Sequence, residues 1–179
     1  MISFHSTSRT VGLLATFIVA TAPQMALATD TPNKTATEKL TRGKYLVTIA
    51  GCNDCHTPAY MEKNGKVPEK DWLTGDAFGW RGPWGTTYAI NLRLYMQGMT
   101  EEEWLKKAAT VEARPPMPFY NLRVMTKDDL RAIYRFARHL GPGGAPAPAY
   151  VPPDKEPKPP YATFPAPPKS MPCIRIRST

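Results

Sequence analysis

The sequence lacks the patterns that mark several classes of protein. Its apolar run at residues 11–20 is ten residues long, whereas a helix needs about 20 residues to span a bilayer. No segment alternates apolar and polar side chains as a half-buried strand does, and no internal repeat is found. These absences exclude a spanning helix at residues 11–20 and a repeat protein, and they favour an all-α body.

The chain also lacks a nucleic-acid-binding pattern, although it is basic. It has 23 Lys and Arg against 15 Asp and Glu, a formal net charge of +8. The basic residues are scattered, and neither a basic helix nor an aromatic-basic platform is present. We therefore expect no nucleic acid partner. Two interpretations of the charge stay open: a solvated surface with no dedicated partner, or electrostatic steering toward an acidic protein.

Residues 1–28 have the pattern of a secretory signal peptide. Arg9 precedes the apolar run, and the small-residue site Ala-Leu-Ala follows at 26–28. Cleavage there removes one Arg and no acid, so the mature charge becomes +7. We expect an exported protein, periplasmic in a bacterium, with no membrane span after cleavage. An uncleaved amphipathic anchor is the alternative.

The rest of the chain divides by composition into three parts. Residues 29–36 are polar and are expected to form a flexible lead-in. Residues 37–141 are long enough for one small domain. Residues 142–179 form a C-terminal extension that holds twelve of the twenty prolines, which favours extended polyproline II conformation. The extension is either a spacer or, as its aromatic residues suggest, a segment docked on the domain or on a partner.

Helical spacing and capping residues predict three helices within residues 37–141. The first runs over about residues 37–50 and ends at Gly51. The second begins at a capping box of Thr100 and Glu103, and the third begins after Thr126 and stops at residues 141–142. Gly43 is costly in mid-helix, which predicts that another helix crosses closely there. Residues 57–98 are rich in Gly and Pro and are expected to form loops.

The strongest chemical signal is the sequence Cys-Asn-Asp-Cys-His at residues 52–56. This C-x-x-C-H pattern is typical of covalent haem attachment. Cys52 and Cys55 are spaced so that their thiols can reach the two vinyl groups on one porphyrin edge. His56 then lies under the ring, where an imidazole nitrogen can bind the iron. We expect one haem c at these three residues.

Three other interpretations of the cysteines fit less well. A thioredoxin-like motif needs a βαβ setting, which the sequence does not predict. A zinc site needs four ligands, and only Cys173 and His139 could complete it. A disulfide between Cys52 and Cys55 would leave His56 unexplained. Cys173 is the odd cysteine, either a free thiol or an intermolecular crosslink.

The second axial ligand is predicted to be Met117. Prolines at 115, 116 and 118 hold this residue in a rigid, non-helical loop, which helps a weak thioether ligand stay on iron. Met125 is the nearest alternative, and His139 looks like a partner for the dipole at the end of the last helix.

These motifs together resemble a known family. Gly-Lys-Tyr at 43–45, the motif at 52–58, Pro-Pro-Met-Pro at 115–118 and the stretch at 125–130 are similar to monohaem class I c-type cytochromes. The likeness covers about residues 37–141 and is closest to cytochromes and cytochrome subunits associated with bacterial alcohol and aldehyde dehydrogenases. The resemblance implies a small all-α domain of short helices around one haem, with His56 and Met117 as the iron ligands.

We therefore expect an electron carrier and no enzyme. His/Met ligation closes both axial positions and raises the reduction potential. The expected partners are redox proteins with acidic docking surfaces, a dehydrogenase as donor or a terminal oxidase as acceptor. Two alternatives stay open: a haem subunit permanently bound to a dehydrogenase, and a haem enzyme or gas sensor with an open distal site.

Overall fold

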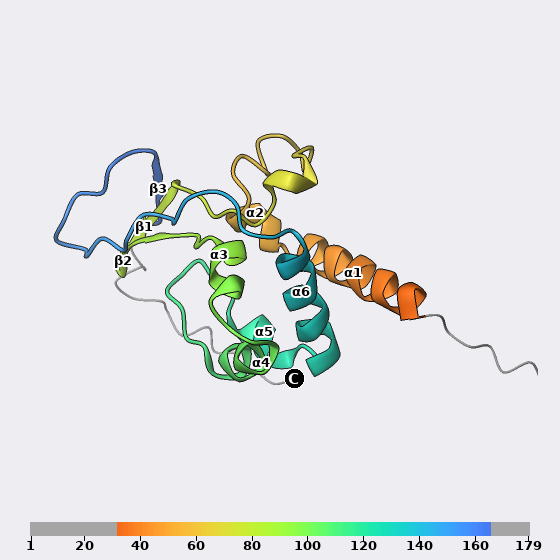
Figure 1. Ribbon diagram of the computed structural model, residues 1–179. Helices are drawn as coiled ribbons and strands as arrows, with labels where there is room; N and C mark the ends of the chain where they lie inside the picture. Colours follow the sequence, from red (N-terminus) through yellow and green to blue (C-terminus); the bar gives the residue numbers. More distant parts are fainter. Residues whose placement is uncertain (1–31, 166–179) are drawn as a thin grey trace, which may run out of the picture. The chain divides into compact units, whose positions relative to one another are not determined.

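A computed structural model of the chain describes residues 32–165, with side chains from residue 35. The predicted signal peptide at residues 1–28, and residues 166–179 with Cys173, lie outside the described residues. The described part is mostly helical and also contains a three-stranded sheet (Figure 1). The described residues are therefore mostly helical, as expected, but they are not all-α.

Six α-helices and one short 3₁₀ helix make up the helical part of residues 32–165. They are α1 (Pro32–Ile49), α2 (Cys52–His56), η1 (Glu69–Asp71), α3 (Leu92–Gln97), α4 (Glu101–Thr110), α5 (Tyr120–Val124) and α6 (Lys127–His139). Helix α1 begins at Pro32, so residues 32–36 of the expected flexible lead-in are helical. Proline suits the first turn of a helix because the N–H groups of that turn have no acceptor within the helix, so a residue without an N–H loses no hydrogen bond there.

Local capping explains where α4 and α6 begin. The side chain of Thr100 accepts a hydrogen bond from the Glu103 N–H, and the Glu103 carboxylate accepts one from the Thr100 N–H at 2.7 Å. Thr126 accepts from the Asp129 N–H at 3.1 Å at the start of α6. Both N-terminal caps are confirmed as the sequence predicted.

Helices α1 and α6 cross at Gly43, as the glycine in mid-helix predicted. A Cβ atom at Gly43 would lie 2.2 Å from the Ala132 carbonyl oxygen and 2.6 Å from the Phe136 Cβ. Only glycine allows the two backbones this close. The crossing anchors the core, whose most deeply buried large side chains include Val47, Leu73, Met96 and Phe136.

Two strands of a small sheet lie in the region that the sequence predicted to be loop, and the third lies in the proline-rich extension. Strand β1 (Gly79–Gly82) pairs antiparallel with β2 (Gly85–Tyr88) and parallel with β3 (Tyr161–Thr163), in the order β2-β1-β3. The strands are three or four residues long and rich in glycine, so no apolar alternation develops. Strands β1 and β2 and helix α3 all lie within residues 57–98, so the prediction of little regular structure there was wrong.

The proline-rich extension contacts the helical body and the sheet at points from Gly143 to Phe164. Asn91 donates through its side-chain amide to the carbonyl oxygens of Gly143 at 2.8 Å and Ala145 at 3.2 Å. Farther along, Val151 and Thr86 exchange two backbone hydrogen bonds of 2.7 and 3.0 Å. Figure 1 shows this blue segment running from the end of α6 to the sheet. Docking is thus the arrangement that the structure adopts.

Arg93 fixes the start of the extension. Its side chain is buried and donates to the carbonyl oxygens of Gly141 and Lys70, both at 2.6 Å, and also to those of Leu140 and Pro142. Such a guanidinium can satisfy several backbone acceptors where the helix ends and the chain turns. The extension is therefore held by a buried side chain as well as by the sheet.

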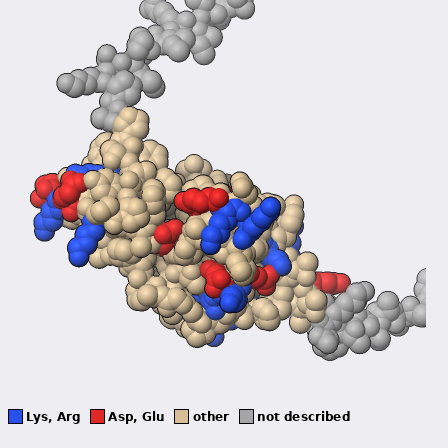
Figure 2. All heavy atoms as spheres, turned by 90° about the horizontal axis from the view of Figure 1, so that it is seen from above, with Lys and Arg blue, Asp and Glu red and all other residues tan. Residues whose placement is uncertain are grey.

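Charged side chains of both signs are interspersed on the face shown in Figure 2. Salt bridges account for part of this mixing, since Arg131 and Arg135 of α6 both contact Glu101 at the start of α4. No helix of the described residues is both long and apolar enough to cross a membrane.

Candidate functional site

A left-handed glycine places the Cys-x-x-Cys-His segment directly after the longest helix. Gly51 has φ +70°, which glycine adopts without steric cost, and it turns the chain from α1 into α2. Cys52 begins α2 and His56 ends it. The three residues of the motif are thus presented on one short helix.

Buried hydrogen bonds hold α2 in place. The Thr57 hydroxyl donates to the Asn53 side-chain oxygen at 2.8 Å and accepts from the Leu73 N–H at 2.8 Å. Both Asn53 and Thr57 are fully buried. These two buried hydrogen bonds favour one orientation of the segment, while the side-chain nitrogen of Asn53 is buried without a partner among the described residues.

His56 is oriented through one of its ring nitrogens. Its Nδ1 lies 2.7 Å from the Ile90 carbonyl oxygen, so Nδ1 carries the proton and donates. Burial is the main cause that lowers the pKa of His56. The neutral ring then keeps an electron pair on Nε2, for which no partner is found among residues 32–165. A neutral imidazole oriented in this way is a ready metal ligand.

The two cysteines are thiols rather than a disulfide. Burial raises the pKa of Cys52 to about 11, and burial also raises the pKa of Cys55. Both groups are therefore protonated at neutral pH, and neither has the lowered pKa of a nucleophilic or redox-active cysteine.

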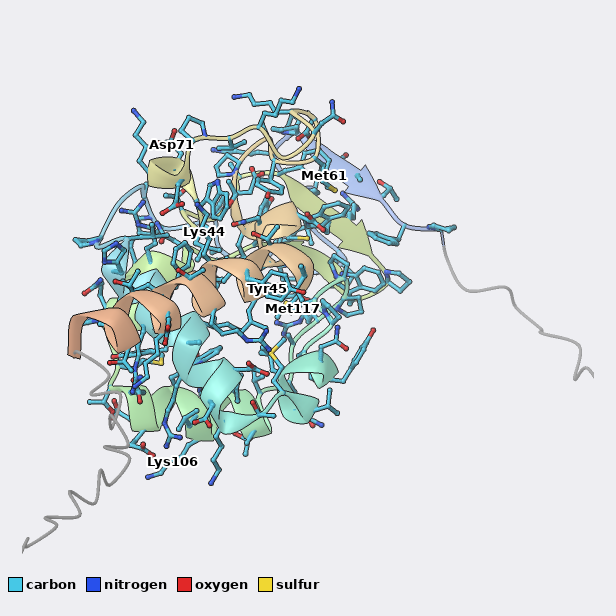
Figure 3. The ribbon with its side chains drawn as sticks, turned by 90° about the vertical axis from the view of Figure 1, so that its right-hand side faces the viewer. Lys44, Tyr45, Met61, Asp71, Lys106 and Met117 are labelled. Atoms are coloured by element: carbon cyan, nitrogen blue, oxygen red, sulfur yellow. The ribbon has the colours of Figure 1, made fainter. Side chains whose placement is uncertain are left out.

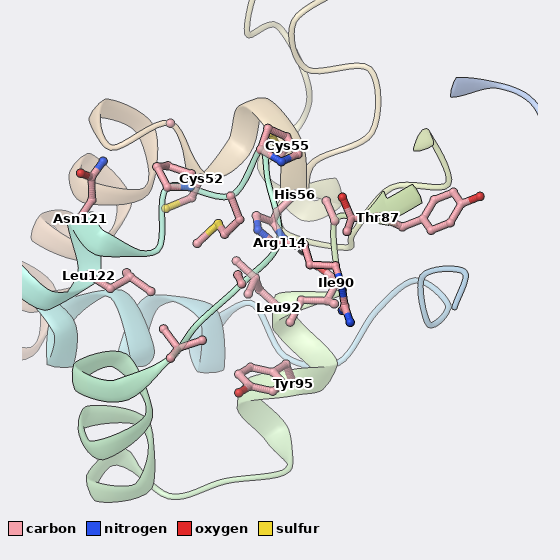
Figure 4. Close-up of a pocket in the computed structure, with 18 of the residues that line it drawn as sticks. Cys52, Cys55, His56, Thr87, Ile90, Leu92, Tyr95, Arg114, Asn121 and Leu122 are labelled. Carbon is pink, nitrogen blue, oxygen red and sulfur yellow. Dashed lines mark hydrogen bonds between the residues drawn. The ribbon is translucent and has the colours of Figure 1, made fainter. Parts of the chain in front are cut away.

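A large apolar cavity opens beside these residues. Its volume is about 510 Å³, within the roughly 300–1,000 Å³ of small-molecule and cofactor pockets. Figure 4 shows Cys52, Cys55 and His56 along one side, with Leu92 and Tyr95 of α3 facing them. The segment that carries the chemistry therefore forms one wall of a space large enough for a cofactor.

Three methionines line the cavity: Met96, Met117 and Met125. Met96 is fully buried in the core, whereas Met117 and Met125 are partly exposed. Met61 is half exposed and lies well apart from Met117 in Figure 3. His139 is exposed at the end of α6 and does not line the cavity. The structure thus brings Met117 and its rival Met125 to the same space and leaves His139 outside.

The loop that carries Met117 is tied to the sheet. The Thr87 hydroxyl of β2 donates to the Pro115 carbonyl oxygen at 2.8 Å, and the Phe119 N–H donates to the Met117 carbonyl oxygen at 2.9 Å. These bonds add to the stiffness of the surrounding prolines.

The cavity also has polar features that the sequence did not indicate. Among the described residues that line it, Lys107 and Arg114 are the Lys and Arg residues, and none is Asp or Glu. Residues 148–150 of the extension form part of the wall. A docked tail was expected only in general terms, because no local pattern says where a proline-rich segment will lie.

The zinc arrangement considered for Cys52 and Cys55 does not form within the described part. No group of three or more His, Cys, Asp and Glu side chains comes together there to hold a metal ion. Comparison of the whole sequence and structure with protein-family models, curated proteins and solved structures finds no match.

Proposed function

We propose that this chain is an exported electron-transfer protein that carries one covalently attached haem c. The observation that carries the proposal is the position of Cys52, Cys55 and His56 on one wall of a 510 Å³ apolar cavity. Two thiols and one oriented imidazole at an apolar cavity match the groups that a c-type haem requires.

The two thiols are suited to attachment. Each S–H adds across a vinyl group, forming a carbon–sulfur bond while the thiol proton goes to the other vinyl carbon. The addition needs no oxidant and releases no leaving group. Cys52 and Cys55 lie on the same short helix, three residues apart, so both face the same edge of the space.

His56 is suited to be the proximal ligand. The hydrogen bond from Nδ1 to the Ile90 carbonyl fixes the tautomer and the ring plane, and leaves Nε2 for the iron. Such a bond from the far nitrogen also raises the basicity of the ligand.

Met117 is the proposed distal ligand, with Met125 as its rival. Both line the cavity, but Met117 alone lies between prolines in a loop tied to β2. Met96 is packed in the core, where a methionine serves as filler. Ligation by both His56 and Met117 would leave no open site on the metal.

A haem held here supplies one reversible electron, as the iron changes between ferric and ferrous states. The chain supplies the ligands and an apolar lining that limits water around the ring. Once Cys52, Cys55 and His56 are engaged with the haem, no Asp, Glu or further His among the described residues lines the cavity, so we propose electron transfer rather than catalysis. The partners that we propose are redox proteins with acidic surfaces, steered by the net positive charge.

The test is the absorption spectrum of protein made in a host that matures c-type haem. We expect haem that survives denaturation, a methionine–iron charge-transfer band in the oxidised form, and no reaction of the reduced form with carbon monoxide. Absence of covalent haem would end the proposal. Covalent haem that binds carbon monoxide readily would instead support an enzyme or sensor with an open distal site.

Matched variants separate the two candidate ligands. Met117→Ala is expected to abolish the charge-transfer band and to open the reduced haem to carbon monoxide. Met125→Ala removes the same kind of side chain from the same cavity and is expected to keep both properties of the wild type. The reverse result would transfer the role to Met125.

A further inference from the structure

The proline-rich extension forms one wall of the cavity, and it is held there firmly. Pro148, Ala149 and Tyr150 line the space. Immediately beyond them, Val151 and Thr86 exchange two backbone hydrogen bonds, and the Tyr150 hydroxyl donates to the Trp84 carbonyl oxygen at 2.8 Å. These bonds attach the wall to strand β2 and the turn before it.

Gly85 permits this close approach. It has φ +94°, and a Cβ atom there would lie 2.5 Å from the Val151 carbonyl oxygen and 2.7 Å from the Tyr150 hydroxyl. A side chain at this position would push the extension away from the cavity. The contact therefore depends on the glycine that begins β2.

Arg114 meets the extension at the same place. Its guanidinium carbon lies 3.9 Å from the centre of the Tyr150 ring, a close cation–π contact. Arg114 and Thr87 both line the cavity (Figure 4), and the Thr87 hydroxyl donates to the carbonyl oxygen of Pro115, the residue next to Arg114. The cation is thus stacked on an aromatic ring that belongs to the tail.

Arg114 has no carboxylate partner among the described residues, although many of its fellow arginines do. Arg42, Arg81, Arg123, Arg131 and Arg135 each form a salt bridge. The cavity that Arg114 lines contains no Asp or Glu in the described part. An arginine at the edge of an apolar cavity, stacked and without an anion, is positioned to receive the carboxylate of a ligand.

We propose that Arg114 binds a carboxylate of the group held in the cavity, and that Tyr150 of the extension positions Arg114 to do so. The inference rests on the proposed function, because a haem carries two propionate carboxylates. The extension then takes part in setting the reduction potential. A positive charge that neutralises a propionate disfavours the ferric state relative to the ferrous state, and so raises the potential.

The experiment measures the midpoint potential of the holoprotein at fixed pH and ionic strength. Arg114→Gln is expected to lower the potential, whereas Arg114→Lys, which keeps the charge, is expected to restore most of it. Tyr150→Ala leaves the charge but removes the stacking ring, and is expected to give a smaller decrease in the same direction. Lys66→Gln, an equal charge change at an exposed residue away from the cavity, is the control.

The outcomes are distinct. A wild-type protein without covalent haem refutes the proposed function itself. With haem attached and the methionine–iron band retained, a potential in Arg114→Gln no different from that in Lys66→Gln refutes the carboxylate contact alone. A shift in Arg114→Gln together with none in Tyr150→Ala refutes the positioning role of the extension. Arg114 is exposed, so its variants are expected to fold normally, which denaturant unfolding checks.

Discussion

Replacing Gly43 by alanine is the sharpest test of the helix crossing. In an isolated helix this change stabilises by about 1 kcal/mol, because glycine loses more backbone entropy. In this chain the added Cβ would lie 2.2 Å from the Ala132 carbonyl oxygen and 2.6 Å from the Phe136 Cβ, where ordinary contact starts near 3.4 Å. The Ala132 carbonyl oxygen belongs to the backbone of α6 and cannot rotate away as a side chain could. Helices α1 and α6 must therefore separate by roughly 1 Å, which weakens the van der Waals attraction between the side chains that face each other.

The magnitude follows from what the crossing buries. Leu46 and Val47 of α1 pack with Ile133, Phe136 and Ala137 of α6, and each is 5 % exposed or less. A fully buried large apolar side chain contributes about 1.5–3 kcal/mol, and a gap of 0.5–1 Å loses about a quarter to a half of the attraction across it. The loss over these side chains exceeds the gain in helix propensity. We expect Gly43→Ala to lower the free energy of unfolding by about 2–3 kcal/mol, in the usual range for overpacking.

Denaturant unfolding of the protein, followed by circular dichroism, measures this change. Gly98→Ala is the matched control, because the nearest atom to its Cβ is 3.6 Å away and its φ of −81° suits any residue. We expect the control to stay within about 0.5 kcal/mol of the wild type. A Gly43→Ala protein as stable as the wild type, or stabilised by helix propensity, would refute the close crossing.

Three further predictions concern the capping, the buried arginine and the tail. Arg93→Met leaves several buried carbonyls without donors and is expected to destabilise by about 3 kcal/mol in the same unfolding assay; a loss under about 1 kcal/mol would show that water replaces the guanidinium. Thr100→Ala removes an N-cap and is expected to cost about 1 kcal/mol. Hydrogen bonds from Thr100 lower the pKa of Glu103 in the folded protein. The carboxylate therefore stabilises the fold above its pKa in the unfolded chain, about 4.3, and this stabilisation is lost as the pH falls through the lower pKa of the folded protein. Unfolding curves at pH 7 and pH 3 should show the wild type losing part of its advantage over Thr100→Ala, and an unchanged difference would count against the capping box. Limited proteolysis should leave residues 142–165 attached, and rapid cleavage after Gly141 would contradict the docked extension.

Parts of the fold were predictable because their causes are local. The Thr100–Glu103 box and the Thr126 cap act over three residues, so the starts of α4 and α6 could be identified from the sequence. Gly43 indicated the crossing because glycine destabilises the interior of a helix and is expected there where another backbone approaches closely. The sheet was missed because its strands are short and because β3 pairs with β1 from about eighty residues away in the chain.

For the candidate site, the spacing of Cys52, Cys55 and His56 within one short helix is enough to predict that two thiols and an imidazole lie together. Which residues face them depends on the packing of distant segments. Residues from five helices, the sheet and the extension line the cavity. Three methionines are among them, and their spacing in the sequence does not indicate that they lie at one cavity. Arg114 and Tyr150 are 36 positions apart in the chain, and their contact exists because Arg93, Asn91 and Thr86 hold the extension along the body. Local sequence specifies helices, turns and motifs, whereas a contact between distant segments depends on the summed packing of the whole domain.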